Sequence, residues 1–202
     1  MPDFMDISRR RHTVRSYAQR QVEPEKLAAV LEAGRWAPTA VNAQPQRILV
    51  LDTPKNLEKV REFCTFGWQK KYVDLACESD TPGHDHIVLY YGAPTVLVVC
   101  YDREACWRHP QTGETSGATD ATIVATHMMM EATSLGLGSA WISYFDHDKA
   151  RELLEIPKSW EFVCMLYLGY ETEDATMNQH LSGSRRPLDE TCFFNTLDQE
   201  GA

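Results

Sequence analysis

The sequence lacks the features of a membrane-spanning, secreted or disulfide-linked protein. No stretch approaches the roughly 18 to 20 consecutive apolar residues that a membrane-spanning helix needs, and the first residues contain no apolar core of a secretory signal. The six cysteines form no Cys-x-x-Cys pair. We therefore expect a soluble, cytoplasmic protein with reduced thiols and no membrane partner.

Familiar catalytic and nucleotide motifs are also missing. There is no Gly-x-Ser-x-Gly elbow and no Walker loop, and Gly136-Leu137-Gly138 follows an expected helix instead of a strand, so it is not a dinucleotide fingerprint. His84-Asp85-His86 has no further ligands at zinc-like spacing, which predicts no metal site. These absences favour an enzyme whose chemistry is supplied by a bound cofactor.

The charge is unevenly distributed along the 202 residues, which we expect to form a single domain over 1–202. The formal net charge is −9, yet residues 1–50 hold eight Lys or Arg against five Asp or Glu. An acidic protein with a basic island is a poor binder of nucleic acid and a plausible binder of one small anion.

The basic island centres on the segment 9–15, which contains four arginines, His12 and Thr13. Guanidinium groups bind phosphate oxygens two at a time, so this segment suggests an anion site, although a solvated basic turn is the alternative. One expected helix later, the loop 37–45 carries two stiffening prolines and two amides that can pair with the edge of a heterocycle.

Apolar periodicity predicts helices alternating with buried strands. The helix beginning near Asp120 is expected to bury Ile123, Val124, His127, Met128, Met130 and Ala132. The irregular, aromatic-rich segment 66–91 is either a lid or a poorly packed surface. The predicted helices are 3–11, 24–36, one from Pro54, 120–136 and 146–155; the predicted strands are 48–52, 94–101, 139–144 and 162–170.

Four motifs in this order resemble the nitroreductase family of flavin enzymes. They are the Arg-rich turn, the Ala-Pro-Thr-Ala-Val-Asn-Ala-Gln-Pro loop, the helix and strand around Leu-Gly-Leu-Gly-Ser-Ala-Trp-Ile, and the closing Arg-Arg-Pro-Leu-Asp-Glu. The chain departs from the family pattern in Thr13 for the usual Ser and Gln46 for the usual Trp. The resemblance implies an α+β nitroreductase-like fold: a mixed central β-sheet flanked by helices, in an intertwined homodimer.

The resemblance also implies an FMN site and assigns residues to it. The phosphate would be held by Arg11, Thr13 and Arg15, with His12 beside them at the backbone, and by Arg185 from the tail, for which Arg186 is the substitute. Residues of the partner subunit's loop would reach the flavin, Gln44 would shape that loop, and Ser143 and Tyr144 would lie near the flavin ring. The loop residues assigned to the flavin are Pro38, Thr39, Ala40 and Asn42.

The activity implied is transfer of hydride from NADH or NADPH, through FMN, to an electron-poor small molecule such as a nitroaromatic or a quinone. No side chain would act as a nucleophile. Two alternatives use the same fold: a specialised flavin reaction such as reductive dehalogenation, and a protein that binds or senses FMN without turnover. A flavin-free protein with a surface anion patch is a third.

Overall fold

The computed structural model describes residues 3–67, 86–88, 90–173 and 185–195. Most of the segment 66–91, interpreted above as a lid or a surface, lies outside these residues. The helices are α1 (Phe4–Arg10), α2 (Pro24–Arg35), α3 (Pro54–Phe63), α4 (Gly117–Ser134) and α5 (His147–Leu153), with short 3-10 turns η1 (Ala40–Asn42) and η3 (Leu188–Glu190). The strands are β1 (Gln46–Leu51), β2 (Thr65–Gly67), β3 (His86–Val88), β4 (Thr95–Asp102), β5 (Gly138–Ile142) and β6 (Trp160–Gly169).

Four strands form the central sheet in the order β1-β4-β6-β5, and each neighbouring pair is antiparallel. A parallel bridge between Thr13 and Ser139 adds the basic segment to the edge of β5. β4 lies centrally between β1 and β6, and its apolar residues are buried on both faces because helices pack on each. The predicted strand at 94–101 is confirmed.

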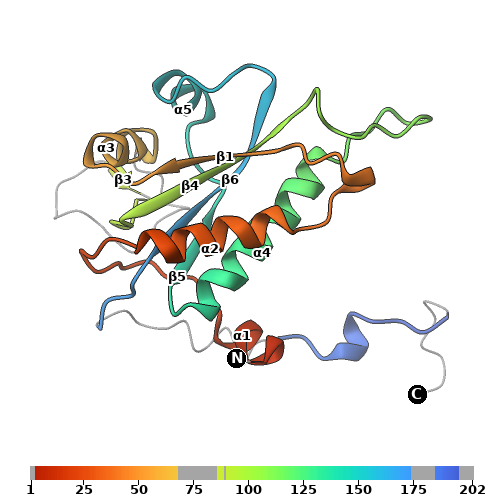
Figure 1. Cartoon of the computed structure of the whole chain (residues 1–202), viewed down its shortest axis with the longest axis horizontal. Helices are drawn as coiled ribbons and strands as arrows, with labels where there is room; N and C mark the ends of the chain where they lie inside the picture. The colour runs from red at the N-terminus through yellow and green to blue at the C-terminus, as the bar shows by residue number, and fades with distance from the viewer. Residues whose placement is uncertain (1–2, 68–85, 89, 174–184, 196–202) are drawn as a thin grey trace.

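Helices cover both faces of the sheet (Figure 1). Alternate residues of β4 enter different apolar clusters: Val98 lies with residues of α3 and α5, and Leu97 and Val99 lie with residues of α2 and α4. The two helices on the second face pack tightly, since a Cβ added at Gly34 would lie 2.7 Å from Cγ of Met128. The expected α+β class is confirmed.

The helix α4 differs from the sequence prediction in its start and in its buried face. It begins at Gly117, three residues before Asp120. Its buried residues recur at intervals of three and four, and His127 falls outside this stripe and is exposed. The prediction that His127 is buried is therefore wrong. Among the described residues, no helix is both long enough and apolar enough to cross a bilayer.

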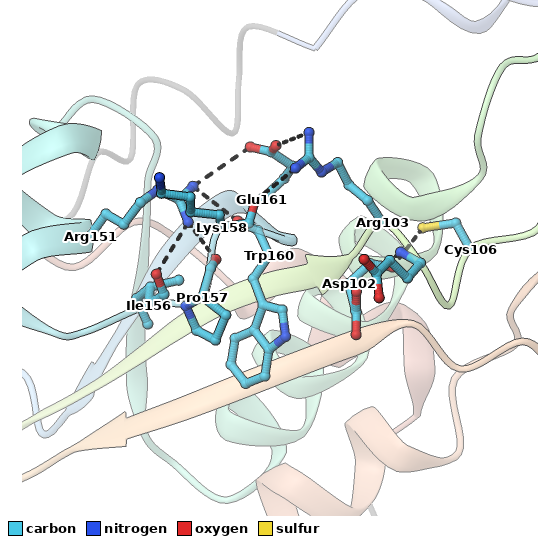
Figure 2. A network of polar contacts seen from close by, with 10 residues as sticks. Asp102, Arg103, Cys106, Arg151, Ile156, Pro157, Lys158, Trp160 and Glu161 are labelled. Carbon is cyan, nitrogen blue, oxygen red and sulfur yellow. Dashed lines mark hydrogen bonds and ion pairs between the residues drawn. The ribbon is translucent and has the colours of Figure 1, made fainter.

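A polar network far from the basic segment fixes the connection between α5 and β6 (Figure 2). The Arg151 guanidinium donates to the carbonyls of Pro157 (2.6 Å) and Trp160 (2.9 Å) and lies 3.8 Å from the Glu161 carboxylate. Arg103, just after β4, pairs with the same carboxylate at 3.2 Å. These contacts tie the carbonyls of the loop and the start of β6 to side chains of α5 and of the residue after β4, so the network is structural.

Candidate functional site

The basic segment lies along the edge of the sheet because Val14 is packed into the core. The Val14 amide donates to the Ser139 carbonyl at 3.0 Å, and its side chain is 1% exposed. The close approach depends on Gly138, where an added Cβ would lie 2.6 Å from Cγ2 of Val14. In extended backbone, neighbouring side chains point to opposite sides, so burial of Val14 turns Thr13 and Arg15 outward.

Two arginines remote in sequence interact electrostatically at this segment. Burial lowers the pKa of half-buried Arg11, and the positive charge of Arg185 lowers it further. Within the described parts of the chain, no carboxylate pairs with Arg11, Arg15 or Arg185. Arg186, by contrast, pairs with Glu190 at 3.7 Å. A cluster of guanidinium groups of this kind suits a multiply charged anion.

A hollow of about 170 Å3 adjoins the segment. Arg11 and His12 line one side, and residues from Gly136 to Ser139 line the other. The Ser139 side chain is 1% exposed, and its hydroxyl has no hydrogen-bond partner among the described residues.

The His12 side chain is committed to another contact. Its Nε2 lies 3.0 Å from both carboxylate oxygens of Glu171, just after β6, and its Nδ1 lies 2.9 Å from the Arg10 carbonyl. Burial opposes protonation of His12, but these hydrogen bonds and the Glu171 charge outweigh it and raise the pKa above the ordinary 6.5. The ring therefore holds the basic segment to the sheet, and a ligand would meet His12 through its backbone, as the resemblance implies.

This pair predicts a pH dependence of stability. A raised folded-state pKa means that the stabilisation is complete below the unfolded pKa of about 6.5 and is lost as the pH rises through the folded value. We expect the melting temperature of the apoprotein to fall between roughly pH 6 and 8, and Glu171→Gln to flatten this slope. Glu173→Gln, two residues away, is the matched control; an equal flattening there would contradict the assignment.

The second predicted segment, the loop from Pro38 to Gln44, has an unusual backbone. Val41, Asn42 and Gln44 have φ values of 48°, 58° and 49°, in the left-handed region that β-branched and bulky residues avoid. The Gln44 amide donates to the Thr39 hydroxyl at 3.1 Å, and the Gln44 side chain donates to the Asn42 side chain at 3.2 Å. Gln44 donates both of these hydrogen bonds within the loop, so it helps to shape the loop.

The structure does not bring this loop to the basic segment of the same chain. The loop contacts the first turn of α4, where the Ala40 amide donates to Asp120, whereas the hollow beside Arg11 includes Thr133 and Gly136 at the other end of that helix. Thirteen residues of helix separate Asp120 from Thr133, about 20 Å at 1.5 Å per residue. Figure 1 shows the same separation: α1, which leads into the basic segment, lies beside the far end of α4 from the loop.

The remaining predicted residues follow β5. Ser143 and Tyr144 lie just beyond the end of β5. The beginning of β5 pairs with Thr13. The Trp141 indole donates to the Ser143 hydroxyl at 2.7 Å, and Tyr144 is 41% exposed. One edge of the sheet therefore carries both the basic segment and the Ser143–Tyr144 step.

Sequence reasoning missed three residues that build these sites: Asp120, Glu171 and Gly138. Asp120 was interpreted only as a helix start, although an acidic residue buried in an apolar stripe is a signal of a specific partner. The partners of Glu171 and Gly138 are remote in sequence, so no local pattern marks them. At Gln46, where the resemblance expects Trp, the side-chain oxygen is buried without a partner among the described residues.

Comparisons with known proteins agree with this fold and site. Residues 8–170 match the model of the nitroreductase family. A nitroreductase family protein from Clostridium difficile 630 is 32% identical, with a TM-score of 0.78 over 98% of this chain and 100% of that one. A protein from Archaeoglobus fulgidus, provisionally named NADH dehydrogenase/NAD(P)H nitroreductase, is 25% identical over 86% of this chain and 88% of its own.

A nitroreductase with bound FMN from Bacteroides fragilis NCTC 9343 has the same fold, with a TM-score of 0.67, 24% identity, and coverage of 87% of this chain and 92% of that one. The fold and the family match define the protein's class as an oxidoreductase. The chain belongs to the nitroreductase family.

Proposed function

We propose that the chain is an FMN-dependent oxidoreductase that takes electrons from NADH or NADPH and passes them to an electron-poor small molecule such as a nitroaromatic or a quinone. The observation that carries the proposal is half-buried Arg11 at the rim of the hollow beside Ser139, under the influence of the Arg185 charge and without a carboxylate partner in the described residues. An anion would relieve the repulsion between these cations, and a phosphate with two charges fits that donor set. The FMN bound by the Bacteroides fragilis relative supplies such a phosphate.

Within one subunit, the residues of this chain would hold FMN at two places. Arg11, Thr13, Arg15 and Arg185 would bind the phosphate, and the backbone at Ser143 and Tyr144 would lie along the ring. When bound, FMN supplies the hydride and electron chemistry, and the protein supplies binding, orientation and a positive field that favours the reduced, anionic form.

Cysteine nucleophiles are not needed for this chemistry and are poorly available. Burial raises the pKa of Cys64 and of Cys100 to about 12, so both remain thiols at neutral pH. Cys164 is also buried, and burial raises its pKa too.

A homodimer would complete the site. The loop at Ala40 lies too far from Arg11 to serve the same cofactor within one chain, so the loop of a partner subunit is the natural source of its contacts. Large apolar side chains are also exposed on α1 and on the C-terminal segment 185–195, which starts beside α1 and extends away from it (Figure 1). Light scattering should give twice the chain mass of 23.0 kDa. The exposed apolar residues on α1 and on this C-terminal segment are Phe4, Met5, Leu188, Phe193 and Phe194; elsewhere in the described residues, Trp36, Val41, Trp107 and Tyr144 are exposed as well.

The proposed activity is tested by turnover of the FMN-loaded protein with either nucleotide and three acceptors: a nitrobenzoate, a quinone and a halogenated phenol. We expect oxidation of NADH or NADPH that depends on the nitro compound or the quinone. Halide release from the phenol alone would favour the dehalogenase alternative. Bound FMN with no turnover of any acceptor would favour a protein that stores or senses flavin.

A further inference from the structure

Asp120, in the first turn of α4, is a buried carboxylate that the proposed chemistry does not use. It is 3% exposed. Its Oδ1 accepts the Ala40 backbone N–H at 3.0 Å, and its Oδ2 accepts the Ser116 hydroxyl at 2.7 Å. No cationic side chain pairs with it within the described ranges. Burying a carboxylate that has only neutral donors costs free energy, and the two hydrogen bonds offset part of this cost.

The bond to Ala40 ties the strained loop to a different element of the fold. Ala40 opens the turn η1, and the residues after it include Val41 and Asn42 in left-handed backbone. Such a conformation persists only where the surroundings hold it. The bonds from Asn42 to the Thr39 carbonyl and from Gln44 to the Thr39 hydroxyl are internal to the loop, so they cannot fix its position on the body.

The second carboxylate oxygen of Asp120 links the loop to the segment between β4 and α4. Ser116 donates its hydroxyl to Asp120, and its backbone amide donates to the Trp107 carbonyl at 3.0 Å. One carboxylate thus connects the loop at Ala40 with the segment between β4 and α4.

We propose that Asp120 is a positioning residue that holds the Pro38–Gln44 loop in the conformation in which it receives the flavin. The inference rests on the proposed function, because the loop is assigned to FMN there. Asp120 itself touches neither flavin nor substrate. It acts through the Ala40 amide. In a dimer, each Asp120 would position a loop that reaches the FMN whose phosphate is bound by the other subunit's basic segment.

The test compares three variants of the full chain at Asp120 and Ser116 by FMN titration and by visible circular dichroism of the bound flavin. Asp120→Ala removes both acceptors, and we expect FMN affinity to fall at least about tenfold, with an altered flavin spectrum at saturation. Asp120→Asn keeps an acceptor for Ala40 and should restore affinity to within about threefold of wild type. Ser116→Ala, the matched control, removes the other bond and should bind FMN about as wild type does.

A fourth variant removes the donor in case Asp120→Ala does not fold. Ala40→Pro deletes the N–H, and Thr39 already has the extended backbone, φ −134° and ψ 153°, that a residue before proline prefers. We expect a loss of FMN affinity similar to that of Asp120→Ala, and no further loss when the two are combined, because both variants remove the same Ala40–Asp120 hydrogen bond.

The outcomes separate this inference from the proposed function. Wild-type protein that binds no FMN would overturn the proposed function. Wild-type protein that binds FMN, with Asp120→Ala or Ala40→Pro showing unchanged affinity and spectrum, would overturn the inference alone. An equal loss in Asp120→Asn and Asp120→Ala would also overturn it, since the retained acceptor would then have no effect.

Discussion

Replacing Arg11 with alanine should weaken FMN binding by about 10- to 100-fold, because a hydrogen bond to a charged group contributes roughly 1.5 to 3 kcal/mol. The same variant should leave the apoprotein at least as stable as wild type. Arg11 has no ion pair within the described residues, and the charge of Arg185 opposes its own, so its removal relieves a repulsion between like charges. FMN affinity by fluorescence quenching and the melting temperature of the apoprotein measure the two effects.

Arg11→Ala is informative because it should weaken FMN binding without destabilising the apoprotein. Arg9→Ala is the matched control, because Arg9 lies only two residues before Arg11, in the last turn of α1, is exposed and does not line the hollow. It should alter neither quantity. An Arg11→Ala protein that keeps wild-type FMN affinity, or one that loses stability in the apo form, would contradict the assignment of Arg11 to the phosphate.

Adding a single methyl group at Gly138 should destabilise the fold and the site together. A Cβ there would lie 2.6 Å from Cγ2 and 3.1 Å from Cβ of Val14, within the sheet edge. Overpacking of this kind costs about 1 to 3 kcal/mol of unfolding free energy. Because Val14 sits between Thr13 and Arg15, its displacement should also weaken FMN binding. Urea unfolding and FMN titration of Gly138→Ala measure both losses.

The rescue is the control for this prediction. Combining Gly138→Ala with Val14→Ala removes the clashing methyl groups, so the double variant should lose less unfolding free energy than the two single losses added together. Strict additivity would show that the two residues are not in contact. At Gly113, nothing lies within 4 Å of an added Cβ, but φ is 74°. The unfolding free energy of Gly113→Ala therefore reports backbone strain without steric crowding.

The regular elements were predictable because their signals are local. The apolar run at β4 fixed the central strand, Pro24 marked the first turn of α2, and Asp146 caps α5 by accepting the Lys149 amide at 3.0 Å. The start of α4 was missed because Gly117 is a poor helix former, and its position there is set by packing: a Cβ would lie 2.2 Å from the Tyr101 ring.

The candidate site was predictable in its residue types but not in its arrangement. The sequence places the Arg-rich turn and the amide loop one helix apart, and only the resemblance assigned the loop to the partner subunit's flavin. The structure separates the two segments along α4, which is what a site shared between subunits requires. The bond from Ala40 to Asp120 spans 80 residues, so it is visible only after folding. The assignments of individual residues to FMN stay predictions.

The most direct test of the central claim is an anaerobic absorbance spectrum of the purified protein after reconstitution with FMN, recorded before and after addition of NADH and then NADPH. We predict bound flavin bands that bleach with at least one nucleotide and return when a quinone is added. Bands that persist with both nucleotides would contradict the proposed reductase, and protein that retains no flavin after reconstitution would contradict the cofactor site itself.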